Sequence, residues 1–202
     1  MSLFFSAVPA TAQTRPLRVV ALGDSLTAGY QLPAAAAFPS VLEKELKAQG
    51  LKVEIANAGV SGDTAAQGLA RLDWSVPDGT DAVIVALGAN DALRGLDPSG
   101  TRSALEQIVS RLKARGIAVM LAGMYAPRNL GADYTRAFDA IYPDLAGKYG
   151  VTLYPFFLDG IVGDPKLNLA DRVHPNPDGV RVMVSRILPT VAAFLTGVAR
   201  KD

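Results

Sequence analysis

The 202-residue chain contains no cysteine and only one histidine, His174. The absence of cysteine excludes disulfides, thiolate nucleophiles and cysteine-ligated metal sites. One histidine also falls short of the two or three that an ordinary zinc centre uses. We therefore expect no metal site, and any acid–base catalysis by histidine must use His174.

Concentrated charge and long apolar runs are also missing. The 20 Lys and Arg residues are scattered among 19 Asp and Glu residues, and the formal net charge is +1. A nucleic-acid surface normally shows a basic stripe, so we expect no nucleic-acid partner. No apolar run reaches the length of a bilayer span, so we expect no stable membrane insertion. The sequence does not indicate an oligomeric state.

The amino-terminal stretch SLFFSAVPATAQT ends in a small-x-small pattern, Ala10-Thr11-Ala12, like a signal-peptidase site. The positive leading segment of such a signal is missing, since the first basic residue is Arg15. We interpret residues 1–14 as the remnant of an export signal, which predicts a periplasmic or secreted protein. The alternative is an ordinary apolar or disordered arm. Residues 15–202 are predicted to form a single domain.

Apolar, β-branched runs alternate along the chain with segments of helical periodicity. The expected strands are residues 17–22, 52–57, 81–87, 117–123 and 151–156. The expected helices are residues 39–50, 63–72, 101–116 and 133–150, the last disturbed at Pro143, and a final helix that starts at Pro177. Apolar strands joined by helices predict an α/β fold whose parallel sheet is covered on both faces.

Four short polar segments lie at the junctions between the predicted strands and helices. GDSLTAGY, NAGVSGD and GANDALRG follow the first three strands, and DRVHPN precedes the final helix. In an open parallel sheet, the carboxyl ends of the strands face one crevice. We therefore expect the four segments to converge on one edge of the sheet.

Together these segments contain the groups that acyl transfer requires. His174 precedes a proline and is predicted to be extended, so that Asp171 can reach one ring nitrogen and leave the other for Ser25. The backbone N–H of Gly59 and the side-chain amide of Asn90 are candidate donors to an oxyanion. Each residue alone has a commoner use as a cap, a turn or a surface residue. Only the combination predicts catalysis.

The four segments resemble the signature blocks of the GDSL, or SGNH, hydrolases, with one hallmark residue in each: Ser25, Gly59, Asn90 and His174. The chain is most similar to the bacterial multifunctional thioesterase I/lysophospholipase L1/arylesterase branch of that family. The resemblance implies a flavodoxin-like, three-layer α/β/α fold with a five-stranded parallel sheet. It also implies ester hydrolysis that needs neither a metal nor a cofactor.

By matching position, the resemblance implies that Ser25 is the nucleophile, His174 the base and Asp171 its partner. It further implies an oxyanion hole made by the N–H groups of Ser25 and Gly59 and the side chain of Asn90. The expected substrates are small-molecule esters with aryl or short- to medium-chain acyl groups. Acyl thioesters and lysophospholipids are further candidates.

Residues that would select the substrate are harder to identify. Ala89 stands where close relatives usually have glycine, which leaves the shape of that loop open. Leu93 and Arg94 resemble a loop beside the acyl site, and Tyr125 and Pro127 are predicted to form another wall. The alternative is that they only pack a long loop.

Two rival functions stay open. The same groups could remove acetyl groups from a carbohydrate. The chain could also be a non-catalytic binding protein on a flavodoxin-like sheet, although such a protein would have no reason to retain five catalytic roles together. The leading prediction is a serine esterase that works through an acyl-enzyme.

Overall fold

The computed structural model describes residues 15–199. Its five-stranded sheet is entirely parallel, with the order β2-β1-β3-β4-β5. The strands are β1 (Leu17–Gly23), β2 (Val53–Gly59), β3 (Ala82–Ala86), β4 (Ala118–Ala122) and β5 (Thr152–Tyr154). This is the flavodoxin-like strand order, which confirms the predicted fold class.

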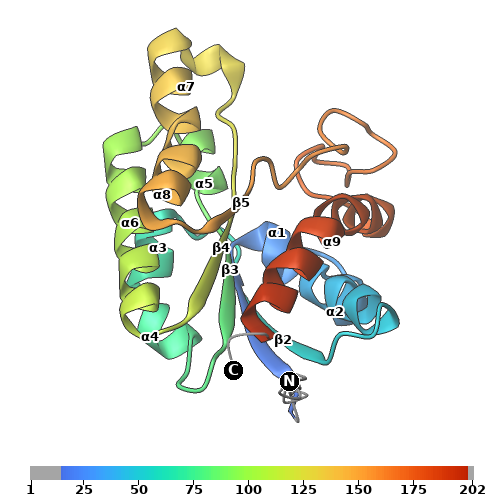
Figure 1. The fold of residues 1–202 in the computed structure, drawn as a ribbon. Coiled ribbons are helices and arrows are strands. Elements are labelled where there is room, and N and C mark those ends of the chain that lie inside the picture. Colours follow the sequence, from blue (N-terminus) through green and yellow to red (C-terminus); the bar gives the residue numbers. More distant parts are fainter. Residues whose placement is uncertain (1–14, 200–202) are drawn as a thin grey trace, which may run out of the picture.

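Helices cover both faces of the sheet (Figure 1). One face carries α1 (Ser25–Ala28), α2 (Phe38–Ala48) and α9 (Pro177–Ala199). The other carries α3 (Ala65–Ala70), α4 (Leu72–Ser75), α5 (Ala89–Leu93), α6 (Pro98–Ala114), α7 (Ala132–Asp139) and α8 (Ile141–Tyr149). Two 3-10 turns, η1 (Ala34–Ala36) and η2 (Arg128–Leu130), lie in the connections. The result is the predicted three-layer arrangement.

Two segments that the sequence predicts as single helices are each divided. Residues 63–72 break at Arg71, which takes a non-helical φ of −101° between α3 and α4. Residues 133–150 break at Ala140, which lies three residues before Pro143. The break places Pro143 in the first turn of α8, where a missing N–H leaves no helical hydrogen bond unmade.

The core lies on both faces of the central strands. Every residue of β3 is buried, as a strand covered by helices on two sides requires. Tyr142 of α8 is fully buried, and its hydroxyl donates to the carbonyl of Leu87 at 2.8 Å. On the other face, the rings of Phe38 and Phe157 meet edge to face at 4.8 Å. These contacts fix the helical layers against the carboxyl edge of the sheet.

Helix α9 corrects one expectation about the sequence. The helix has 23 residues, and an 18-residue window within it has a mean hydropathy of 1.7, which is enough by length and composition to cross a membrane. In the sequence, the apolar residues of this helix are interrupted by Asp178, Arg181 and Arg186. The chain therefore shows no long uninterrupted apolar run at this place. The helix buries seven residues on one side and contacts α2 and β5. These seven residues therefore lie in the core of the fold, while 28% of the most apolar 18-residue window is buried.

The predicted export segment, residues 1–14, lies outside the described residues. A periplasmic or secreted location therefore stays a prediction from the sequence.

Gly123 forms two backbone hydrogen bonds that join the end of β4 to the end of β5 and the residues after it. Its N–H donates to the carbonyl of Tyr154, and its own carbonyl accepts from Phe157, both at 2.8 Å. A Cβ at this position would lie 2.4 Å from the carbonyl oxygen of Pro155. Because that neighbour is backbone, we expect Gly123→Ala to lower the free energy of unfolding by about 1–3 kcal/mol, measured by urea denaturation.

Gly147→Ala is the matched control. Gly147 lies within α8, and no heavy atom would come within 4 Å of its Cβ. Alanine should leave the free energy of unfolding unchanged or raise it by up to about 1 kcal/mol. Equal stability of the two variants would contradict the close approach at Gly123.

Candidate active site

The polar segments that follow β1, β2 and β3 meet at the carboxyl edge of the sheet. The strand order changes direction between β1 and β3, and ligands of such sheets bind at that switch point. Ser25 starts α1 two residues after the end of β1, and Asn90 lies in α5 four residues after the end of β3. The long segment between β5 and α9, orange in Figure 1, brings His174 to the same edge.

Ser25 is the first residue of α1 and is only 8% exposed. The cap of this helix is Asp24, whose Oδ1 accepts the N–H of Leu26 at 3.0 Å. The serine hydroxyl is therefore not used as a cap. Within residues 15–199, the backbone N–H of Ser25 also has no acceptor.

His174 joins the serine to a carboxylate. Its Nε2 lies 2.9 Å from Ser25 Oγ, and its Nδ1 lies 2.8 Å from Asp171 Oδ2. The other carboxylate oxygen of Asp171 accepts the backbone N–H groups of Val173 at 2.9 Å and His174 at 3.0 Å. Asp171 thus holds both the loop and the ring, and the imidazole presents one nitrogen to the hydroxyl.

The loop that carries His174 is anchored at both ends. Asn176 caps α9, because its Oδ1 accepts the N–H groups of Asp178 and Gly179, both at 3.0 Å. The N–H of Leu169 donates to the carbonyl of His174 at 2.8 Å. The cap confirms the helix start at Pro177 that the sequence predicts.

Two carboxyl groups near the imidazole have opposite pKa shifts. Hydrogen bonds from the backbone N–H groups of His174 and Val173, and from the imidazole, lower the pKa of Asp171 to about 2. Burial raises the pKa of Asp24 to about 6. Asp171 is therefore ionised throughout the neutral range, as a carboxylate that balances an imidazolium must be.

The candidate oxyanion donors differ in how they are occupied. The side-chain Nδ2 of Asn90 donates to the carbonyl of Asp63 at 3.0 Å and to Asp24 Oδ2 at 3.3 Å. The N–H of Gly59 donates to Asn57 Oδ1 at 3.0 Å, so it is not available as the sequence analysis expects. The glycine at this position instead permits a close approach of α1, because a Cβ would lie 2.2 Å from the nitrogen of Ala28.

A second glycine of the same segment, Gly62, donates no hydrogen bond to any acceptor within residues 15–199. Gly62 takes a φ of +87° and immediately precedes Asp63, whose carbonyl binds Asn90. The sequence NAGVSGD offers both glycines, and only the fold shows which N–H Asn57 occupies.

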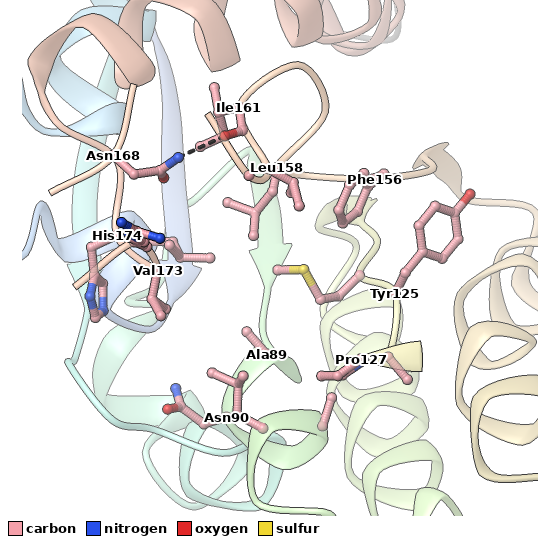
Figure 2. A pocket seen from close by; sticks show the side chains of 18 of the residues that line it. Ala89, Asn90, Tyr125, Pro127, Phe156, Leu158, Ile161, Asn168, Val173 and His174 are labelled. Atoms are coloured by element: carbon pink, nitrogen blue, oxygen red, sulfur yellow. Dashed lines mark hydrogen bonds between the residues drawn. The ribbon is translucent and has the colours of Figure 1, made fainter. Parts of the chain in front are cut away.

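Beside Ser25 lies a largely apolar cavity of about 530 Å³ (Figure 2). Figure 2 shows His174 and Asn90 at one end and Tyr125 at the other. Leu93, Tyr125 and Pro127 lie in the wall of the cavity, as does Ala89. Among the four residues that the sequence proposes for substrate binding, Arg94 is the exception. Its guanidinium donates to the carbonyl of Gly62 at 2.7 Å and does not line the cavity.

The part of the wall that follows β5 is not among the residues predicted from the sequence. Phe156, Leu158 and Ile161 line the cavity from a segment without regular structure (Figure 2). The ring of Phe156 stacks on Tyr125 with centroids 4.8 Å apart. An apolar run, FFLDGIV, just beyond a strand was the available signal.

Known proteins are similar to this chain in sequence and in fold. Residues 21–182 match the GDSL-like Lipase/Acylhydrolase family. The chain is 40% identical over 177 residues to an arylesterase of Vibrio mimicus, covering 87% of this chain and 88% of that protein. It is 42% identical over 158 residues to thioesterase 1/protease 1/lysophospholipase L1 of Escherichia coli strain K12, covering 78% and 74%. The crystal structure of AlinE4, an SGNH-hydrolase family esterase, matches with a TM-score of 0.75 and 46% identity, covering 89% and 96%.

The lowered pKa of Asp171 predicts how the site contributes to stability. A carboxyl group whose pKa is about 2 when folded and 3.8 ordinarily favours folding in its ionised form. That contribution is complete above about pH 4 and is lost as the pH falls through about 2. We expect Asp171→Asn to be less stable than the parent near neutrality, with a difference that shrinks as the pH falls toward 2. Urea unfolding at a series of pH values measures it.

Asp133→Asn is the control for this comparison. Asp133 is almost fully exposed and pairs only with Arg136 at the start of α7. Its variant should track the parent at every pH, because an exposed ion pair contributes little. A difference between Asp171→Asn and the parent that did not vary with pH would contradict the charge effect.

Proposed function

The chain belongs to the GDSL-like lipase/acylhydrolase family and is a carboxylic ester hydrolase, and we propose that Ser25 is its nucleophile. His174 is the general base in this proposal, and Asp171 orients it. The observation that carries the proposal is the 2.9 Å separation between His174 Nε2 and Ser25 Oγ. The 2.8 Å contact on the other side of the ring supports the role of Asp171.

The proposed reaction has two proton-transfer cycles. His174 Nε2 removes the proton as Ser25 Oγ attacks the acyl carbon, then returns it to the leaving alcohol or thiol. The acyl group stays on Ser25 until a water, deprotonated by the same nitrogen, attacks the acyl carbon. The bond between Ser25 Oγ and the acyl carbon then breaks, the acid leaves, and His174 returns the proton to Ser25 Oγ. Only the neutral imidazole can act as the base, so activity should rise with pH through its titration.

The tetrahedral intermediates need donors for their oxyanion. We assign this role to the backbone N–H groups of Ser25 and Gly62 and to the side chain of Asn90. The two N–H groups have no competing acceptor within residues 15–199. Asn90 would give up the longer of its two bonds, the 3.3 Å contact with Asp24. Gly59 is left out because its N–H already serves Asn57.

The cavity supports a small-molecule ester with an apolar acyl or aryl group as substrate. A volume of about 530 Å³ greatly exceeds an acetyl group, and the wall offers few polar partners to a sugar. These features favour acyl or aryl esters over acetylated carbohydrates. The names of the arylesterase and thioesterase 1/lysophospholipase L1 relatives support extending the proposal to thioesters and lysophospholipids.

Substitution of the proposed nucleophile and base tests the mechanism. We expect Ser25→Ala and His174→Ala each to lower kcat for a p-nitrophenyl ester by about 10³-fold or more. A fluorophosphonate probe should label the parent protein and not Ser25→Ala. Circular dichroism should show that both variants fold.

Ser185→Ala is the matched control, because Ser185 is an exposed serine of α9 that bonds only within its own helix. It should keep the parental rate and labelling. Hydrolysis by Ser25→Ala at the parental rate would rule the mechanism out. A parent protein that the probe does not label would favour the binding-protein alternative.

The length of the acyl chain tests the cavity. Each methylene that the cavity buries contributes up to about 0.8 kcal/mol, or about fourfold in kcat/KM. Phe156→Ala removes the ring that stacks on Tyr125 in the wall. We expect it to lower kcat/KM for an octanoyl ester by about tenfold and to leave that for the acetyl ester nearly unchanged.

Phe194→Ala provides the comparison. Phe194 is a half-buried ring of α9 that faces a hollow at the amino ends of β3, β4 and β5. Its variant should keep the parental dependence on chain length. A parent protein that hydrolyses acetyl and octanoyl esters with equal kcat/KM would contradict the acyl cavity.

A further inference from the structure

The ring of Tyr30 packs against the ring of His174. The two centroids lie 4.4 Å apart, and the ring planes are tilted by 37°. The ring nitrogens of His174 are occupied by Asp171 and Ser25, so the tyrosine contacts a face of the imidazole. The proposed mechanism does not use this contact, and Tyr30 is not among the residues that line the acyl cavity.

The backbone holds Tyr30 against the catalytic segment. Its N–H donates to the carbonyl of Ser25 at 3.1 Å, as does the N–H of Gly29. Tyr30 stands between two left-handed residues, Gly29 with a φ of +81° and Gln31 with a φ of +58°. Such a φ is uncommon for a residue other than glycine and persists where the surroundings determine it. The turn after α1 therefore bonds Tyr30 to the backbone of Ser25 and places its ring against His174.

We propose that Tyr30 is a positioning residue for the catalytic base. Its ring limits the rotation of the imidazole, so that Nε2 stays directed at Ser25. Its π face also favours the imidazolium that forms in each proton transfer. This inference rests on the proposed function, because it assigns Tyr30 a role only if His174 exchanges protons.

Other charges near the imidazole must be separated from the effect of the ring. Asp171 contacts Nδ1, and the buried Asp24 also interacts electrostatically with His174. Arg172 precedes His174 by two residues and lines the cavity. A substitution at Tyr30 leaves these three groups in place. Because Tyr30 is 38% exposed, we expect its electrostatic contribution to be modest.

Tyr30→Leu and Tyr30→Phe form the matched pair. Leucine fills much of the space without a π face, and phenylalanine keeps the ring without the hydroxyl. For p-nitrophenyl acetate, we expect Tyr30→Leu to lower kcat by about three- to tenfold with little change in KM. Its acidic limb of kcat/KM should move to lower pH by about half a unit, because the imidazolium loses a favourable contact. Tyr30→Phe should behave as the parent does.

The single histidine allows a direct measurement as well. His174 gives the only imidazole signals in a proton NMR spectrum of the chain. The midpoint of their titration should fall in Tyr30→Leu and stay at the parental value in Tyr30→Phe. If Tyr30→Leu does not fold, Tyr30→Met carries the same test.

Three results would overturn the inference. Parental kcat and an unmoved acidic limb in Tyr30→Leu would show that the ring does not act on the base. Equal losses in both variants would assign the effect to the hydroxyl. A rise in KM that depends on the leaving group would make Tyr30 a substrate contact. Failure of the proposed function is distinguishable, since it appears as ester hydrolysis by Ser25→Ala.

Discussion

The 2.9 Å contact between His174 and Ser25 joins residues that lie 149 positions apart in the chain. A shift of about 1 Å would remove the hydrogen bond on which proton transfer depends. The serine is positioned from the buried β1, while the histidine comes from a segment without regular structure. The sheet and the helical layers must therefore hold these two parts in one geometry.

The segment between β5 and α9 achieves this through internal bonding. Asn168 is buried and donates to the carbonyls of Ile161 at 2.7 Å and Asp164 at 2.8 Å, which closes the part of the segment that lines the cavity (Figure 2). The fully buried Phe157 fastens its beginning to the core, and the Asn176 cap fastens its end. Because its polar groups have hydrogen-bond partners, a long loop of this kind can hold functional residues in place. One segment thus supplies both the base and a wall of the cavity.

The sequence predicts the strands, the family and the convergence of the polar segments, because apolar runs and strand ends depend on local pattern. It does not distinguish Gly59 from Gly62, since the difference lies in a hydrogen bond to Asn57 that only the folded loop makes. It also places Arg94 at the substrate, whereas the guanidinium reaches the loop after β2. Such differences are expected where the position of a group depends on which partner it meets across the fold.

Two carboxyl groups near the imidazole, those of Asp171 and Asp24, have different electrostatic roles. Asp171 keeps its charge at every working pH, because backbone N–H groups hold its pKa at about 2. Asp24 is buried with a pKa of about 6 and shares the amide of Asn90 with the carbonyl of Asp63. In the proposed mechanism, an ionised Asp24 competes with the oxyanion for that amide and also favours the imidazolium. The charge of Asp24 would therefore act on both the oxyanion donor and the base.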